Sequence, residues 1–429
     1  MKKKIAIFHP EGNVGSNVNL KSIAKLLINS GYSIDYIHYA TESINDLAGN
    51  PFFNDIIVPF QLPLSSVGSS WNFCIGIDGG VCDAEKVYRT AQIPFLFLSY
   101  EIFFMEEAKT ADEKNFIHNM KTAAKSARFA ITQDELRAAI LQNEYGLTCP
   151  ILRIPVAGSG IIPHRRSHFL HERCNIPLDK KILLHMGSIA SWTMADWLAE
   201  HADALPENWV IVFHGRYGIQ NPPFPSHKKI FYSCEQAKTP EEFRNIVQSA
   251  DCCAVLYKAT YDSLFTGKNI QEIGLSSTKF SVALQHGIPV INNDTKQMQH
   301  IIAKYKCGLS IDTRSKNAFS EFGNFFSEID TQNCFSAFQK CLDLTIYFPN
   351  FLEYIKKNLI KNQIIAFPSF GYTQCIHVVE KFPSYLLIKL FLSLLRLLLF
   401  RCTNKIKRSY MRTLNSYSRS LQHFFFKKR

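Results

Sequence analysis

The chain has 429 residues, more than one hydrophobic core usually supports, and its 46% apolar content is that of globular domains. Lys and Arg number 48 against 36 Asp and Glu, yet the last 49 residues, from Lys381 on, hold 12 basic residues and no acidic one. The part before them is therefore formally neutral. This argues against a nucleic-acid-binding core, and for a basic tail that meets either an anionic membrane or nucleic acid.

The cysteines and the N-terminus indicate a compartment. The 12 cysteines form no CxxC pair, so buried free thiols in a reducing environment fit better than a zinc site or a disulfide framework. The apolar run Ile5–Phe8 ends before Pro10 and is shorter than the apolar region of a signal peptide. A cytoplasmic protein is expected.

Apolar strand-like runs alternate with helical patterns along most of the chain. Residues 1–165 contain one such series, which starts with Ile5–Phe8, and residues 166–345 contain a second, which starts with KKILLHMGS. This alternation predicts α/β architecture with a parallel sheet in each domain, and ligands of such sheets bind at the carboxyl ends of the strands. Residues 346–380 are expected to be a helical crossover segment, and residues 381–429 a separate tail.

A loop with two glycines follows the first predicted strand. In HPEGNVGSN, Gly12, Gly15 and Ser16 lie between a strand and a helix, where backbone N–H groups can face an anion or a sugar. The loop lacks the GxGxxG pattern, so binding of a dinucleotide such as NAD is disfavoured. The alternative is a tight turn with no ligand.

Two strands of the second domain end in small residues. Gly187 and Ser188 follow KILLHM, and Gly215 and Arg216 follow WVIVFH. An arginine at a strand end can bind phosphate oxygens through two parallel hydrogen bonds. The alternative is an ordinary surface arginine.

The most informative stretch runs from Gly274 to Ile291. Ser276, Ser277 or Thr278 can cap the helix that follows. Lys279 falls in the first turn, where a cation opposes the helix dipole but suits a diphosphate. The alternative is an ordinary αβ unit with an exposed lysine.

In this stretch the chain resembles the GT-B glycosyltransferases, in particular the bacterial, sugar-nucleotide-dependent enzymes of the retaining type. The likeness covers roughly residues 5–345 and rests on Ser277–Ile291 together with the segments ILLHMGSIA, SADCCAVLYK and ITQDELRAAIL. It implies two doubly wound parallel-sheet, Rossmann-like domains that face a cleft. The first would bind the acceptor and the second the donor nucleotide.

The resemblance also implies a site. Catalytic roles fall on Glu101, Arg216 and Lys279, because a carboxylate can orient sugar hydroxyls or accept a proton and the two cations can stabilise a leaving diphosphate. For Glu101 and for Asp78, which has the same position after a strand, a surface or capping role is the alternative. The donor-binding set is Gly187, Ser188, Gly215, Arg216, Glu272, Ser276, Ser277, Thr278 and Lys279, and the acceptor side comprises Gly12, Gly15, Ser16, Asp78 and Glu101.

One departure from the family concerns the nucleotide ribose. Many members carry a glutamate in the donor helix, but this chain has Val282, Ala283 and Leu284 at the corresponding places. Glu272 is a loose substitute. The departure leaves the identity of the donor, and catalytic activity itself, open.

The tail combines apolar and basic residues. Tyr385–Phe400 is apolar except for Lys389, Ser393 and Arg396. As a helix it would be roughly 24 Å long, too short to span a hydrocarbon core, but suited to lie in the membrane interface. The alternative is a helix packed on the body of the protein. The cations expected to meet anionic lipid are Lys389, Arg396, Arg401, Lys405, Lys407 and Arg408.

The resemblance, together with the composition and the tail, implies a cytoplasmic glycosyltransferase that is peripheral on the inner face of the cell membrane. It would transfer a hexose or related sugar from a nucleoside-diphosphate sugar to a growing surface glycan of the capsule, lipopolysaccharide or O-antigen type. No metal or other cofactor is expected because cations would neutralise the diphosphate, and no nucleic-acid partner is expected. Two alternatives remain: a sugar-nucleotide epimerase of the same fold, and a noncatalytic glycan- or lipid-binding partner of a synthase complex.

Overall fold

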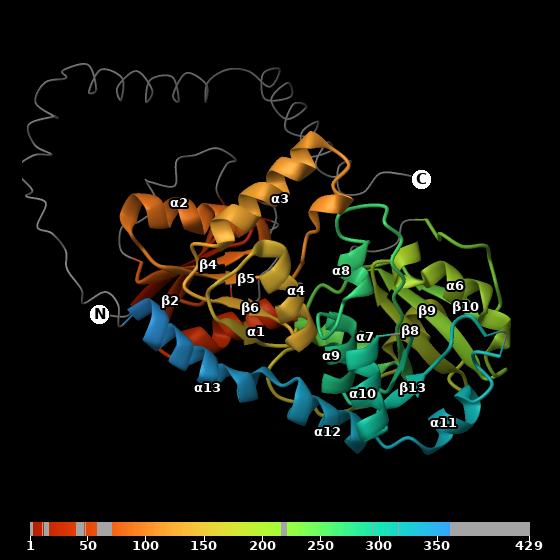
Figure 1. Ribbon diagram of the computed structural model, residues 1–429. Helices are drawn as coiled ribbons and strands as arrows, with labels where there is room; N and C mark the ends of the chain where they lie inside the picture. The colour runs from red at the N-terminus through yellow and green to blue at the C-terminus, as the bar shows by residue number, and fades with distance from the viewer. Residues whose placement is uncertain are drawn as a thin grey trace, which may run out of the picture. The chain divides into compact units, whose positions relative to one another are not determined.

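The first domain is built on a seven-stranded sheet in which all neighbouring strands are parallel. The computed structural model describes residues 3–10, 12, 17–39, 47, 49–57, 71–215, 221–293, 295–315 and 317–360. The strand order is β3-β2-β1-β4-β5-β6-β7 (Figure 1). The strands are β1 (Lys3–Phe8), β2 (Tyr32–His38), β3 (Phe53–Ile57), β4 (Phe73–Ile77), β5 (Phe95–Leu98), β6 (Ala130–Thr132) and β7 (Ile151–Arg153).

Helices cover both faces of this sheet, so its strands are apolar on both sides. In β1, Ile5 and Ile7 pack into one core, and Ala6 and Phe8 pack into the core on the opposite face. One face is covered by α1 (Val18–Asn29) and α13 (Leu344–Ile355), and the other by α2 (Val81–Ala91), α3 (Ala111–Ala124) and α4 (Glu135–Tyr145).

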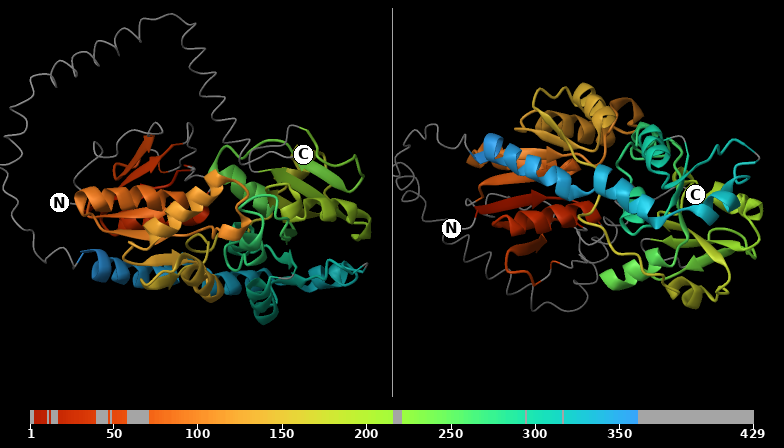
Figure 2. Two further views of the ribbon diagram at one scale, coloured as in Figure 1. Left: turned by 45° about the horizontal axis from the view of Figure 1, so that its top comes forward. Right: turned by 90° about the horizontal axis from the view of Figure 1, so that it is seen from below.

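The second domain repeats this plan with six parallel strands in the order β10-β9-β8-β11-β12-β13. Figure 2 shows this domain from two further sides, coloured from yellow-green to cyan. They are β8 (Lys181–Gly187), β9 (Trp209–Gly215), β10 (Ile230–Ser233), β11 (Cys252–Val255), β12 (Val290–Asn292) and β13 (Gly308–Ser310). One face packs against α5 (Phe169–Cys174), α7 (Pro240–Gln248), α9 (Thr278–Gln285), α10 (Lys296–Tyr305) and α12 (Thr331–Cys341). The other packs against α6 (Ala195–Glu200) and α11 (Phe322–Glu328). The predicted pair of Rossmann-like domains is confirmed.

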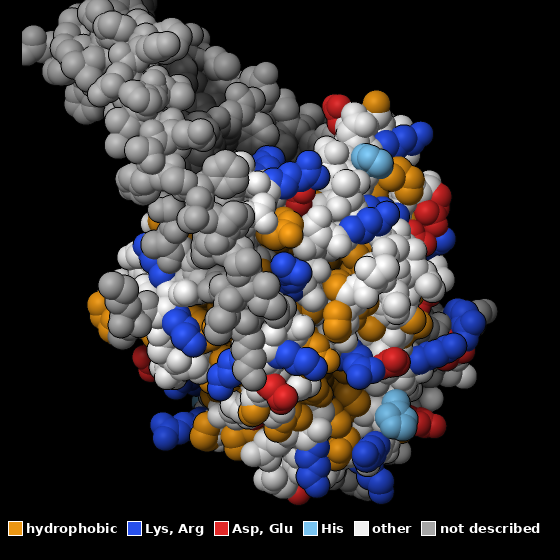
Figure 3. All heavy atoms as spheres, turned by 60° about the vertical axis from the view of Figure 1, so that its left-hand side comes forward, with side chains coloured by type: hydrophobic (Ala, Val, Ile, Leu, Met, Phe, Trp, Pro, Cys, Tyr) orange, Lys and Arg blue, Asp and Glu red, His pale blue; other side chains and the backbone are white. Residues whose placement is uncertain are grey.

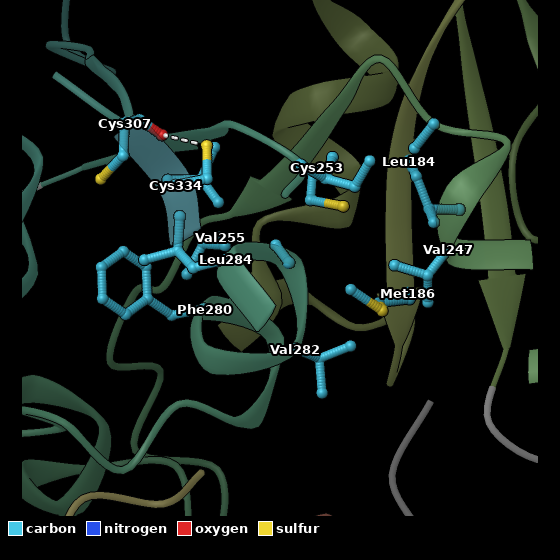
Figure 4. Close-up of a cluster of buried hydrophobic side chains, with 14 of the residues drawn as sticks. Leu184, Met186, Val247, Cys253, Val255, Phe280, Val282, Leu284, Cys307 and Cys334 are labelled. Carbon is cyan, nitrogen blue, oxygen red and sulfur yellow. Dashed lines mark hydrogen bonds between the residues drawn. The ribbon is translucent and has the colours of Figure 1, made fainter. Parts of the chain in front are cut away.

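The core beneath α9 fixes that helix on the second sheet. Phe280 and Leu284 of α9 lie in the same buried cluster as Leu184 of β8 and Val255 of β11 (Figure 4). Cysteines contribute to this core as small apolar side chains, and the Cys334 thiol donates to a backbone carbonyl oxygen. All ten cysteines of the described part are free thiols, as their scattered spacing indicated.

After the second domain the chain returns to the first. The N–H of Leu344 donates to the carbonyl oxygen of Gly158, 3.1 Å away, which lies just beyond β7. Farther along α13, Phe351 and Tyr354 meet the ring of Phe129, at the start of β6. Helix α13 therefore runs antiparallel to the strands, and a π-helical turn, Lys356–Ile360, continues it. The rest of the predicted crossover segment and the whole tail lie outside the described residues.

In the described part of the chain, every helix is too short or too polar to cross a membrane.

Candidate functional site

Lys279 is the centre of the candidate site. Helix α9 begins at Thr278, and the Ser277 side chain caps it by accepting from the N–H of Phe280 at 3.2 Å. Lys279 follows in the first turn and is only 9% exposed. Its Nζ makes no hydrogen bond to any described residue. A buried ammonium group without a partner is costly, and it points to a ligand that the protein alone does not supply.

An aromatic side chain supports this lysine. The Nζ of Lys279 lies 5.6 Å from the ring centroid of Tyr257, which follows β11. The Tyr257 hydroxyl is 2.7 Å from Oγ of Ser277, so the same tyrosine also braces the helix cap. The ring of Trp192 stacks on Tyr257, with centroids 6.2 Å apart. Tyr257 thus fixes the cap and the lysine relative to each other.

The electrostatics follow from burial. Burial lowers the pKa of Lys279 from 10.5 to about 7, so the amine loses its proton readily when no anion is present. Burial, and then the nearby Lys279 charge, hold the pKa of His185 well below 6.5. His185 is therefore neutral near pH 7, and its Nδ1 has no partner among the described residues. Among the described residues, burial and Cys253 are the influences on the Lys279 pKa, and a carboxylate is not one of them, so an entering anion would not compete with a carboxylate for this cation.

The strand ends predicted to bind the donor lie at the same edge of the second sheet. Gly187 ends β8 and pairs with Gly215 at the end of β9. A Cβ on Gly187 would lie 3.4 Å from Cε of Lys279, so the backbone at Gly187 lies next to the lysine side chain. Ser188 follows, and its carbonyl oxygen accepts from Thr193. Arg216 lies outside the described residues.

The acceptor-side carboxylates make contacts of two kinds. Asp78 Oδ1 accepts from the N–H groups of Tyr100 and Glu101 at 2.9 and 3.1 Å, so it shapes the turn after β5. Glu101 accepts a short hydrogen bond from the side chain of Asn269, in the second domain. Asp78 thus accepts hydrogen bonds from the backbone, while the Glu101 side chain reaches the second domain.

The remaining predicted residues are placed as follows. The hydroxyl of Ser276 donates to the carbonyl oxygen of Tyr100 at 3.3 Å, and Glu272 offers its own carbonyl oxygen to Arg137 at 2.9 Å. The N–H of Gly12 donates a hydrogen bond of 3.0 Å to the carbonyl oxygen of His9, which directly follows β1. Gly15 and Ser16 lie outside the described residues. In the described part, no group of three or more His, Cys, Asp or Glu side chains could hold a metal ion.

Sequence reasoning missed Tyr257, Arg137 and Asn269. Tyr257 could have been found, because it stands two residues after the end of β11, at the edge of the sheet where ligands bind. Arg137 lies in a helical pattern and gave no sign of burial. Asn269 lies in the short helix α8 (Lys268–Gln271), and nothing nearby in the sequence singles it out.

The comparisons support the fold. The chain is similar to HepE from Anabaena in complex with UDP-glucose, with a TM-score of 0.62 and 12% identity over 82% of this chain and 99% of that one. It is similar to WaaG, a glycosyltransferase involved in lipopolysaccharide biosynthesis, with a TM-score of 0.55 and 14% identity over 82% and 99%. It is also similar to sucrose-phosphate synthase from Thermosynechococcus elongatus, with a TM-score of 0.57 and 12% identity over 83% of this chain and 99% of that one.

No protein-family model matches the sequence, and no curated protein matches it significantly. At these identities the structural similarities establish the fold, which is that of the GT-B glycosyltransferases.

Proposed function

We propose that this protein is a glycosyltransferase that transfers a sugar from a nucleoside-diphosphate sugar to a glycan acceptor. The observation that carries the proposal is the buried Lys279 amine, which has no partner among the described residues and lies in the first turn of α9. A diphosphate at this helix end would supply the missing counter-charge. It would also accept from backbone N–H groups near Ser277 and Thr278, since the first N–H groups of a helix have no intrahelical partner.

The fold neighbours favour this ligand over other anions. HepE structures contain UDP and UDP-glucose, and WaaG is a glycosyltransferase by its own description. In the proposed complex the nucleotide lies on the second domain, at the edge formed by Gly187 and Gly215. Arg216 follows directly in the sequence and would add a second cation to the phosphates.

The chemistry we propose is stabilisation of the leaving nucleotide. Transfer breaks the bond between the anomeric carbon and the diphosphate oxygen, so negative charge grows on the diphosphate in the transition state. A preorganised ammonium and aligned N–H groups stabilise that charge without reorganising at the moment of reaction. Glu101 would orient a hydroxyl group of the acceptor. Retention of configuration and a bacterial type of enzyme are parts of the proposal that rest on the sequence resemblance.

The proposed acceptor is a surface glycan of the capsule, lipopolysaccharide or O-antigen type, reached from the cytoplasmic face of the membrane. The support is the basic, partly apolar tail, whose proposed lipid contacts at Lys389, Arg396, Arg401, Lys405, Lys407 and Arg408 lie outside the described residues. The role of WaaG in lipopolysaccharide biosynthesis is consistent with it.

The test is nucleotide release from a panel of UDP-, GDP-, CMP- and TDP-sugars, with native membranes supplied as acceptor. We expect turnover of one donor by the wild type and its loss in Lys279→Ala. The matched control is Lys296→Ala, which removes an exposed lysine from the first turn of α10 and should keep full activity.

One outcome would favour a different function. Val282, Ala283 and Leu284 are buried in the core at the places where many of the resembling enzymes carry a ribose-binding carboxylate. If no donor is turned over and none raises the melting temperature, the enzyme proposal fails, and a noncatalytic glycan- or lipid-binding role takes its place.

A further inference from the structure

Exposed cations gather at one edge of the first domain. Because the strands of its sheet are parallel, all begin at one edge, and the helices between them end there. Lys3 stands at the start of β1, Lys125 caps the C-terminus of α3, and Arg128 precedes β6. Lys356 and Lys357 follow α13, which ends at the same edge. All five side chains are exposed, and we call this set the basic edge.

Acidic side chains compensate this charge only in part. Glu85 pairs with Arg89 and Glu144 with Lys121, so these two carboxylates are already neutralised. Glu353, on the last turn of α13, is exposed. Five cations against this one carboxylate leave an excess of four positive charges among these residues. Since residues 1–380 are formally neutral as a whole, this excess marks an uneven distribution of charge over the body.

Ion pairing within the fold does not account for the cations of the basic edge. None of the five forms an ion pair with another described residue. Lys3 and Arg128 lie over the rings of Tyr32 and Tyr88, at 6.0 and 5.9 Å from the centroids, contacts that leave the charges accessible. Figure 3 shows this side of the molecule, where Lys and Arg side chains are spread over the visible surface.

The chain also leaves the described part at this edge. The last described residue, Ile360, follows the two lysines, and the sequence continues to a segment with 12 basic and no acidic residues from Lys381 on. Within it, Tyr385–Phe400 is predominantly apolar. Nucleic acid would account for the cations but not for a run of leucine and phenylalanine beside them, whereas a lipid surface accounts for both.

We propose that the basic edge docks on an anionic membrane surface. Stable attachment of a peripheral protein generally takes two membrane-binding elements. The apolar, basic tail would be one of them, and the basic edge would be the other. Glu101 follows β5 at the opposite edge of the same sheet, so docking leaves it uncovered for a soluble sugar nucleotide and for the growing end of a glycan anchored in the membrane. This proposal does not depend on glycosyl transfer.

The experiment measures partition of the full chain onto vesicles of phosphatidylcholine alone and of phosphatidylcholine mixed with phosphatidylglycerol. The edge variant carries Lys125→Gln, Arg128→Gln, Lys356→Gln and Lys357→Gln. A basic residue near an anionic leaflet contributes roughly fivefold in binding, and partial screening lowers this, so we expect at least about a tenfold loss on the mixed vesicles. Binding to phosphatidylcholine alone should change little.

The matched control removes the same number of charges from exposed lysines of the second domain: Lys296→Gln, Lys304→Gln, Lys306→Gln and Lys340→Gln. It should keep wild-type binding, and thermal unfolding checks that both variants fold. Equal loss in both variants, or no loss in the edge variant, overturns the proposal. A loss of affinity for single-stranded nucleic acid larger than that for the mixed vesicles would identify nucleic acid as the partner instead and equally overturn it.

Discussion

The guanidinium of Arg137, in the first domain, donates to the side chain of Asn269, in the second, across 3.1 Å. The same guanidinium also reaches the carbonyl oxygens of Glu272 and Tyr100, at 2.9 Å each. Asn269 in turn donates to Glu101. These contacts join the loop after β5 to the segment that leads into α9. The position of the proposed donor helix therefore depends on a side chain of the proposed acceptor domain.

Replacing Arg137 with Met should destabilise the fold strongly. Arg137 is 1% exposed, and the variant removes one donor from each of several acceptor oxygens around it. We expect a loss in the free energy of unfolding on the order of 2–4 kcal/mol, seen as a lower urea midpoint. The control is Arg153→Met, which removes an exposed ion pair with Glu135 and should cost less than about 1 kcal/mol. Equal midpoint shifts would contradict this role.

At Gly274 the backbone of the same segment lies close to the carboxylate of Asp134. Its φ is +52°, and a Cβ there would lie 2.0 Å from Oδ2 of Asp134, which accepts from the N–H of Leu275 at 2.7 Å. Gly274→Ala should therefore cost more than the roughly 1–2 kcal/mol of a left-handed backbone alone and should raise the KM for the sugar nucleotide.

Gly31 offers the matched control for this substitution. Its φ is +89°, and nothing lies within 4 Å of a Cβ built there. Gly31→Ala should thus show the backbone cost only and leave the KM unchanged. If both variants lose similar stability and leave the KM unchanged, the close contact between Gly274 and Asp134 has no special role.

Local patterns in the sequence predicted the elements well. The alternation of apolar runs and helical spacing identified both sheets, because strands buried on two faces read as continuous apolar runs. The start of the helix was readable to within a residue or two, since Ser276, Ser277 or Thr278 could cap an apolar helical pattern that ends at Gly287, and the structure has Ser277 as the cap. The catalytic roles of Glu101, Arg216 and Lys279, and the donor-binding roles of Arg216 and Lys279, stay predictions.

Contacts between distant segments could not be predicted in this way. The sequence left open whether Lys279 is exposed. In the structure Lys279 is buried, and its Nζ lies over the ring of Tyr257, a residue 22 positions earlier in the chain. Arg137 and Asn269 are 132 positions apart, so a single sequence gives no sign that they meet. The helical pattern of α13 likewise does not say which sheet the helix covers.

The stability of the empty protein should depend on pH through Lys279. Since burial lowers its pKa from 10.5 to about 7, the unfolded chain holds a proton between these values that the folded chain lacks. The contribution of Lys279 to stability therefore rises with pH across this window. Below pH 7 the folded state bears the full cost of the charge, on the order of 3–5 kcal/mol. Lys279→Met should thus raise the melting temperature most near pH 6, and a pH-independent difference would contradict this.

Binding of the sugar nucleotide should show the opposite pH dependence. Its diphosphate carries no proton that titrates near neutrality, and it favours the charged form of Lys279. Binding above pH 7 must therefore take up a proton, and affinity should fall by up to about tenfold per pH unit above 7, until the raised pKa of the complex is reached. Calorimetry in buffers of different ionisation enthalpy measures this uptake directly. In Lys279→Met both the affinity and its pH dependence should be lost. An equal proton uptake in the variant would assign the titration to another group, since the amine is then absent.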